Sequence, residues 1–168
     1  MAEFVVHNVP GSPFGRSVLA TLEEKGAAWR LVPVSPGTLR EPAHLRMHPF
    51  GRVPVFVDGD LTLWESRAIL AYVGETTGRL WPATAAERAE ALKWLLFLSQ
   101  HIMPSAGAVA LRIRARVRGI PADEAVIARG EKALPDPIRV VEDHSRKTGG
   151  CWVPSSAWWI APIARSST

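Results

Sequence analysis

The stretch Arg52-Val53-Pro54-Val55-Phe56-Val57-Asp58-Gly59-Asp60-Leu61-Thr62-Leu63-Trp64-Glu65-Ser66-Arg67 contains most of the signal for the fold. The bond before Pro54 precedes a short apolar run and is a candidate for the cis form, which proteins keep mostly at tight turns. Asp58-Gly59-Asp60 separates two strand-forming runs and predicts a hairpin. Glu65 and Ser66 then open a helix, where free N–H groups favour a bound anion. Together these features predict a seat for a small ligand that bears a carboxylate.

The residues before this stretch predict the remainder of an α/β domain. β-Branched and aromatic runs indicate strands, and apolar residues at helical spacing indicate helices between them. A strand, a helix and a strand in close succession predict a parallel βαβ unit. The expected elements are a strand over 3–9, a helix over 14–25, a strand over 29–34, a short helix around His44, the hairpin over 54–64 and a helix over 65–77. The order β-α-β-α-β-β-α implies a mixed sheet.

The second half of the chain is expected to be helical. Thr84 and Glu87 fit a capping box, and the helix that they open is expected to continue, kinked, past Pro104 to about Arg118. A further helix is expected from Pro121-Ala122-Asp123-Glu124. Pro135 and Pro137 fall inside its expected body, where each would remove a backbone hydrogen bond. We therefore divide the chain into an α/β domain over 1–78, a linker over 79–85 and an all-helical domain over 86–168.

The composition is that of an ordinary soluble globular protein. Of its 168 residues 47% are hydrophobic and 21% are charged, and the net charge is +4. No run of 18 or more apolar residues and no basic leader appears, so we expect no membrane partner and a cytoplasmic location. The arginines at 112, 114, 116 and 118 are spread around a helix, so we interpret them as a solvated helix end and expect no nucleic-acid partner. The single cysteine, Cys151, excludes an intrachain disulfide, and no His/Cys/Asp set has metal-ligand spacing.

Four motifs in order resemble the glutathione transferases, most of all the serine-type classes typified by the phi and tau enzymes. They are Gly11-Ser12-Pro13-Phe14, the helix from Val18 to Gly26, His48-Pro49-Phe50-Gly51-Arg52-Val53-Pro54, and the segment from Asp58 to Ile69. The resemblance is strong over 3–78 and continues, more weakly, over 79–145. It implies a thioredoxin-like domain followed by an all-helical domain.

The resemblance implies a catalytic serine, Ser12, that donates a hydrogen bond to the glutathione sulfur and favours the thiolate. The backbone of Val53 would pair with the cysteinyl part of glutathione in the manner of an added strand, and Pro54 would hold that backbone open as a cis proline. Glu65 would meet the γ-glutamyl amine and Ser66 its carboxylate. The alternative interpretation of Ser12 is a simple turn residue. The alternative interpretation of the Glu65-Ser66 pair is a plain helix start.

The other end of glutathione has two candidate residues. Arg40 or Arg52 would pair with the glycyl carboxylate, although Leu39 stands where phi-type enzymes often have a histidine. Each arginine is equally compatible with a solvated surface charge.

Phe50 and Arg67 occupy positions that face the partner subunit in the family. They imply a homodimer, and packing of Phe50 under its own loop is the alternative.

As a whole, the resemblance implies an enzyme that uses glutathione as a co-substrate, without a metal, for conjugation to a small apolar electrophile or for peroxide reduction. No cysteine lies near position 12, and the only tyrosine, Tyr72, falls in an expected helix, so thiol- and tyrosine-type mechanisms are not expected. The alternatives are a non-catalytic glutathione-binding or dimerisation module and a degenerate product with little function. Trp159 and Pro162 stand where the family starts a helix with a capping Ser/Thr and an aspartate. We therefore expect a truncated or diverged helical domain, with the order of residues 146–168 left open.

Overall fold

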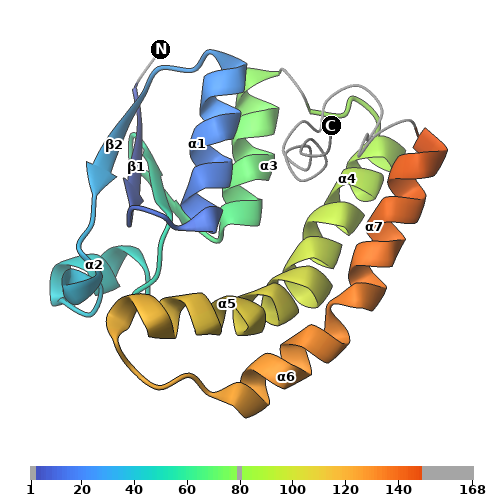
Figure 1. Ribbon diagram of the computed structural model, residues 1–168. Helices are drawn as coiled ribbons and strands as arrows, with labels where there is room; N and C mark the ends of the chain where they lie inside the picture. Colours follow the sequence, from blue (N-terminus) through green and yellow to red (C-terminus); the bar gives the residue numbers. More distant parts are fainter. Residues whose placement is uncertain (1–2, 79–80, 149–168) are drawn as a thin grey trace. The chain divides into compact units, whose positions relative to one another are not determined.

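A computed structural model describes residues 3–78 and 81–148 of the chain (Figure 1). The chain forms two compact units, and the boundary between them in the sequence falls between Trp81 and Pro82. The first unit is α/β and the second is helical, as the sequence predicts. The limits of the linker stay a prediction.

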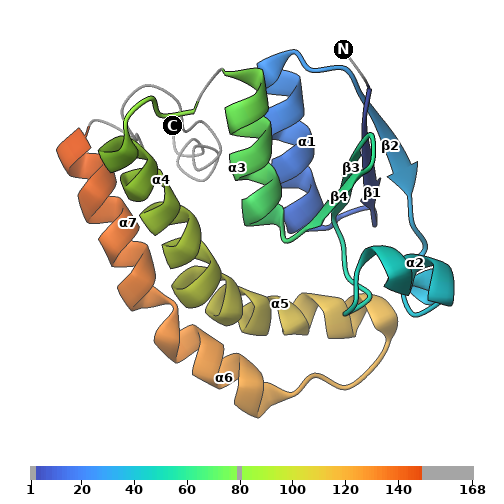
Figure 2. The same ribbon diagram turned by 180° about the vertical axis from the view of Figure 1, so that it is seen from behind.

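The first unit is built on a mixed four-stranded sheet with the order β2-β1-β3-β4. β1 and β2 run parallel, whereas β3 is antiparallel to both β1 and β4, and Figure 2 shows the β3–β4 hairpin. The strands are β1 (Phe4–Asn8), β2 (Trp29–Pro33), β3 (Val55–Asp58) and β4 (Leu61–Trp64). The predicted βαβ unit and hairpin are therefore confirmed, and the β-α-β-α-β-β-α order is observed.

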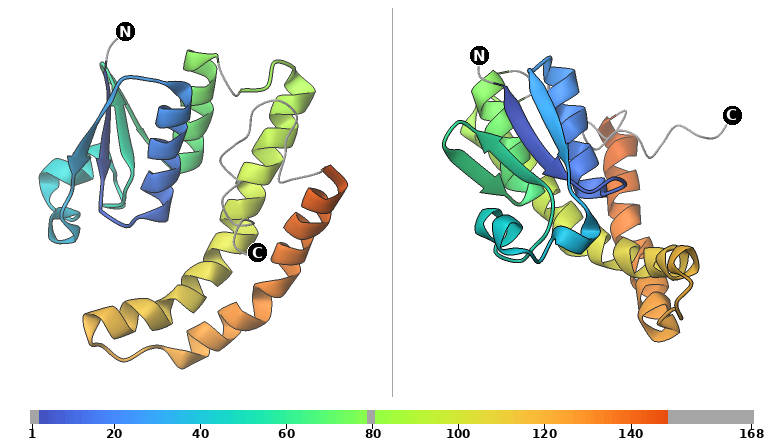
Figure 3. Two further views of the ribbon diagram at one scale, coloured as in Figure 1. Left: turned by 45° about the horizontal axis from the view of Figure 1, so that its top comes forward. Right: turned by 90° about the vertical axis from the view of Figure 1, so that its left-hand side faces the viewer.

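Two helices, α1 (Pro13–Lys25) and α3 (Ser66–Thr77), lie side by side on one face of this sheet (Figures 1 and 3). Their apolar faces and the central strands form the core, which includes the fully buried Val6, Val18, Leu22, Phe56 and Ile69. Burial of one such side chain stabilises the fold by about 1.5–3 kcal/mol. A short 3-10 turn (Pro36–Thr38) and α2 (Pro42–Met47) connect β2 to β3.

The second unit contains α4 (Ala85–Phe97), a π-helical stretch (Leu98–Ile102), α5 (Met103–Arg118), α6 (Glu124–Ala133) and α7 (Pro135–Thr148). The capping box of Thr84 and Glu87 is present at the start of α4. The helix continues past Pro104 as predicted, because Pro104 falls in the first turn of α5, where its missing N–H costs little. The regular α-helical hydrogen bonding is interrupted just before Pro104, in the π-helical stretch that joins α4 to α5 (Figure 3).

One prediction for this unit was wrong. Pro135 and Pro137 do not interrupt the body of a helix, because α6 ends at Ala133 and α7 begins at Pro135. Both prolines lie in the first turn of α7, where backbone N–H groups have no intrahelical partner to lose.

Arg112 differs from the solvated charge that we expected. Its guanidinium donates to Glu131 at 2.8 Å and to Glu124 at 3.0 Å, and both carboxylates belong to α6. The three side chains are about half exposed, so the two ion pairs contribute little to the stability of the fold. Their main effect is to orient α6 on α5.

Among the described residues, Ala85–Arg118 is one helical stretch long and apolar enough on average to cross a membrane, although polar residues interrupt it. The core helices of soluble proteins can be as long and as apolar. Length and composition therefore do not distinguish a membrane-spanning helix from a core helix. Cys151, Trp159 and Pro162 lie outside the described residues, as does all of 149–168.

Two helical glycines of the second unit provide a test of its packing. A Cβ on Gly130 would stand 2.6 Å from the Cβ of Ala108 and 2.8 Å from the carbonyl oxygen of Ser105, whereas a Cβ on Gly107 would meet nothing within 4 Å. We predict that Gly130→Ala lowers the free energy of unfolding by about 1–3 kcal/mol, because α6 is forced away from α5. The matched control Gly107→Ala should raise it by about 0.5–1 kcal/mol. Urea unfolding followed by helical circular dichroism measures both, and equal effects of the two variants would show that the helices are not in close contact.

Candidate functional site

A hollow of about 330 Å³, open solvent included, lies in the first unit at the point where β3 and α3 begin. Three parts of the chain meet there: the start of α1, the segment between α2 and β3, and the start of α3. The lining residues are Phe14, His48, Arg52, Val53, Pro54, Glu65 and Ser66. Five of the seven predicted glutathione-site residues therefore come together, whereas Ser12 and Arg40 are not among the lining residues.

The segment before β3 presents its backbone to this hollow. The Val53–Pro54 bond is cis, as the sequence suggested. β3 pairs with its neighbours only from Val55 onward, so the backbone of Val53 stands outside the sheet. Gly51 has a φ of 58°, and a Cβ there would collide with the carbonyl oxygen of Leu39, so only glycine fits this turn.

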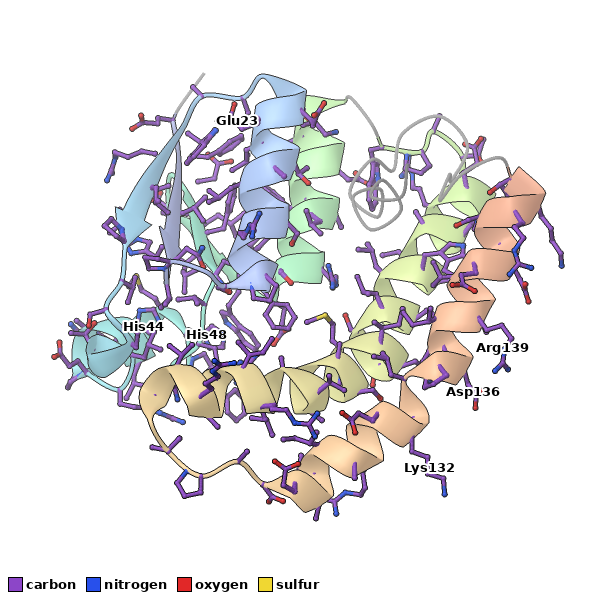
Figure 4. The ribbon with its side chains drawn as sticks, viewed as in Figure 1. Glu23, His44, His48, Lys132, Asp136 and Arg139 are labelled. Atoms are coloured by element: carbon purple, nitrogen blue, oxygen red, sulfur yellow. The ribbon has the colours of Figure 1, made fainter. Side chains whose placement is uncertain are left out.

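Two histidines that the sequence analysis did not assign to the site support this segment. The Nε2–H of His44, on α2, donates to the carbonyl oxygen of Arg52 at 2.9 Å. The Nδ1 of His48 accepts the backbone N–H of Phe50 at 3.3 Å, and its ring lies 5.1 Å from that of Trp64. Both histidines are at least 95% buried, and Figure 4 labels them at and just after α2. The sequence signal that could have identified them is their spacing of four residues, directly before the Pro-Phe-Gly turn.

Glu65 has the most unusual backbone of the site. Its φ of 70° is the only positive φ of a non-glycine residue among those described. Such a conformation costs about 1–3 kcal/mol and is retained mainly at functional positions. It caps α3 without a side-chain hydrogen bond, so its exposed carboxylate is available beside the buried Ser66 and the free N–H groups of the helix start.

Ser12 caps α1. Its Oγ accepts the backbone N–H of Gly15 at 3.4 Å, and no second hydrogen bond of this hydroxyl is seen within the described part of the chain. Because a hydroxyl has one hydrogen to donate, that hydrogen remains available to an outside acceptor. A Cβ on Gly15 would collide with the side-chain amide of the buried Asn8, so the start of α1 must approach β1 closely.

The remaining predicted residues lie around this segment. Arg40 is exposed, with its Cδ about 3.1 Å from where a Cβ on Gly51 would stand. The guanidinium of Arg52 lies 5.9 Å from the ring centroid of Phe50, and that ring is 60% exposed, so it does not pack under its own loop. Arg67 is partly buried, and burial lowers the pKa of its guanidinium. Within residues 3–78 and 81–148, no three His, Cys, Asp or Glu side chains are close enough to hold a metal ion.

Comparisons with known proteins show which family this chain is similar to. The family model "Glutathione S-transferase, N-terminal domain" matches residues 2–75. The chain is 36% identical to glutathione S-transferase F9 of Arabidopsis thaliana over 79% of its own length, and 36% identical to glutathione S-transferase 3 of Zea mays over 86%. The crystal structure of glutathione transferase F2 from Populus trichocarpa is similar with a TM-score of 0.79 and 32% identity, over 86% of this chain and 71% of that one. The chain spans 65% of the Arabidopsis thaliana relative and 68% of the Zea mays one.

The strained backbone at Glu65 leads to a stability prediction. Replacement by Gly removes the strain and replacement by Ala keeps it, so Glu65→Gly should be more stable than Glu65→Ala. Glu41 provides the control, because it also caps a helix without a side-chain bond but has an ordinary φ of -70°. The Gly-over-Ala advantage should be about 1 kcal/mol larger at position 65 than at position 41. Thermal or urea unfolding of the four variants measures this difference, and equal advantages would show that Glu65 is unstrained.

Proposed function

Because the chain belongs to the glutathione S-transferase family, we propose that it binds glutathione in the hollow before β3 and uses it as a co-substrate. The reaction is conjugation to a small apolar electrophile or reduction of an organic peroxide. The family and the thioredoxin-like first domain were both predicted from the sequence, and both are confirmed. The activity and the roles of individual residues belong to the proposal.

The observation that carries the proposal is the conjunction of Glu65 and Ser66 with the free backbone of Val53 in one hollow. In this arrangement, Ser66 and the N–H groups of α3 bind the γ-glutamyl carboxylate, where the helix dipole is positive. The carboxylate of Glu65 binds the γ-glutamyl ammonium group. Val53 pairs its backbone with the cysteinyl residue as an added strand would. The strain at Glu65 is then explained, because it directs a carboxylate into the seat.

Ser12 then activates the thiol. A free thiol with a pKa near 8.5 is mostly protonated at neutral pH, and the thiolate is the nucleophile. The Ser12 hydroxyl donates its free hydrogen to the sulfur, and the adjacent start of α1 adds its positive dipole end. A decrease of roughly two units in the thiol pKa corresponds to about 2.7 kcal/mol, which a hydrogen bond to a charged group and a helix N-terminus together supply.

At the glycyl end, Arg52 is the better placed of the two arginines, because it lines the hollow while Arg40 does not. The neighbouring Phe50 is the basis for proposing a homodimer, since an exposed phenyl ring in a loop is usually covered by a partner. Arg67 is proposed to lie at the same interface. We further propose a cytoplasmic protein without nucleic-acid or membrane partners and without a metal.

The second candidate function is a glutathione-binding or dimerisation module without catalysis. It is favoured by one observation, the absence of Ser12 from the residues that line the hollow. Binding to glutathione without conjugation of a reactive aryl halide would support it.

Replacement of Ser12 tests the enzymatic proposal. We predict that Ser12→Ala lowers kcat/KM for a reactive aryl halide about 25-fold at pH 7, because the thiol pKa returns toward its free value and the thiolate fraction falls. Glutathione should still raise the melting temperature of this variant, since the rest of the seat is unchanged. Ser35→Ala is the matched control, because Ser35 also caps a helical turn, by accepting the N–H of Gly37, but lies away from the hollow. A Ser12→Ala enzyme as active as Ser35→Ala would exclude the assigned role.

Replacement of Phe50 tests the homodimer. Phe50→Ala should shift the protein toward monomers, because it removes the most exposed aromatic ring of the described residues. Leu31→Ala is the control, since Leu31 is also exposed, at 41%, but lies on β2. Light scattering after size-exclusion chromatography gives the mass of each variant. An unchanged mass for Phe50→Ala would rule out this residue as the interface anchor.

A further inference from the structure

We propose that His48 is a positioning residue for the glutathione seat, and that its neutral ring holds the turn which presents Val53 while protonation releases that turn. The inference rests on the proposed function for the identity of the ligand. Its structural part concerns the protein alone and can be tested without glutathione.

The turn is held at three points. The carbonyl oxygen of His48 accepts the N–H of Gly51 at 2.8 Å, which closes a four-residue turn. The His48 ring accepts the N–H of Phe50, the third residue of that turn, at 3.3 Å. One residue further on, His44 donates to the carbonyl oxygen of Arg52 at 2.9 Å. Two histidines therefore form hydrogen bonds with the backbone of the segment that precedes Val53.

The two histidines respond differently to protonation. A carbonyl oxygen only accepts, so His44 carries its hydrogen on Nε2 and keeps this bond when the ring becomes charged. A backbone N–H only donates, so Nδ1 of His48 must be unprotonated. Protonation of His48 therefore removes the acceptor of the Phe50 N–H, and the Nδ1–H of the charged ring then faces that N–H as a second donor. Protonation therefore breaks the bond that His48 makes to the backbone and leaves the bond of His44 intact.

The groups around His48 oppose its protonation on balance. Burial is the largest influence and lowers its pKa below 6.5, and the nearby His44 on α2 and Arg52, directly after the turn, act in the same direction. Glu65 at the start of α3 acts in the opposite direction, and the Trp64 ring at the end of β4 is neutral. His44 itself faces His7 of β1. Because the folded pKa is lowered, the stabilising contribution of neutral His48 is complete above pH 6.5 and is lost as the pH falls through the lowered value.

The chain offers a matched variant for this test. The ring of His48 accepts the N–H of the residue two positions ahead, which is what the side-chain oxygen of asparagine does in an Asx turn. His48→Asn therefore keeps an acceptor for Phe50 but cannot titrate. His48→Leu keeps the apolar bulk and removes the acceptor. His101→Asn removes an exposed histidine of the second unit and serves as the control for histidine loss as such.

The ligand-free arm follows the Phe50 amide by nitrogen-15 NMR between pH 8 and pH 5. In the unmodified protein and in His101→Asn, its shift should move with a single midpoint below pH 6.5 that matches the titration of the His48 ring. In His48→Asn the Phe50 amide should not move. A Phe50 shift that is independent of pH in the unmodified protein, or equally dependent on pH in His48→Asn, would overturn the inference whether or not glutathione binds.

The ligand arm measures the Kd of S-methylglutathione by calorimetry over pH 5 to 7, because its thioether cannot titrate and its carboxylates and amine barely titrate in this range. The Kd of the unmodified protein should rise about fivefold toward pH 5, as expected for the loss of one net hydrogen bond. His48→Asn should show a flat profile near the pH 7 affinity, and His48→Leu a flat profile that is weaker throughout. A protein that binds neither glutathione nor S-methylglutathione at pH 7 contradicts the proposed function, whereas tight binding of S-methylglutathione with the same slope in His48→Asn contradicts only the inference.

Discussion

The backbone that leads into β3 has to stay out of the sheet, and the rest of the first unit is arranged around this constraint. β3 is a central strand, paired on both sides from Val55. Immediately before it, Val53 lies outside the strand pairing, and in the proposed seat its backbone groups pair with the ligand. Unpaired backbone groups at the edge of a core are costly, so the turn must be fixed by other means. Gly51 fits against the carbonyl oxygen of Leu39, and His44 occupies the carbonyl oxygen of Arg52.

The chemistry of the proposed seat comes from two helix N-termini that are capped in different ways. α1 begins with a serine whose oxygen accepts a helix N–H, which leaves its hydrogen for a sulfur atom. α3 begins with a glutamate that makes no such bond, so its first N–H groups remain unsatisfied. An ordinary capping residue at position 65 would stabilise the helix and close the anion site at once. The strained, uncapped start is therefore consistent with binding and hard to explain by stability.

Most of the fold could be predicted because its signals are local. The cis-proline segment, the Asp-Gly hairpin and the glycine that ends α1 each act within a few residues, and the structure contains all three. The prolines of α7 were misplaced, because no glycine or polar cap marks the break at Leu134 and a proline inside a helix cannot be told from one that starts the next. The roles of His44 and His48 were missed because both rings form hydrogen bonds with backbone groups, and the residue types in the sequence do not indicate such bonds. That Ser12 does not line the hollow could not be predicted, because it depends on how closely α1 packs on β1, where Gly15 meets Asn8.

The features that cost free energy are concentrated between His48 and Ser66. A buried histidine must stay neutral, a phenyl ring is left 60% exposed, and a glutamate adopts a positive φ. Each is unfavourable for the isolated unit, at about 1–3 kcal/mol for the strained backbone alone. The βαβ core, with Val6, Leu22 and Phe56 fully buried, provides the stability that offsets them. Costs of this kind, retained together in one segment, are consistent with the proposed roles of that segment: a ligand at Glu65 and a partner surface at Phe50.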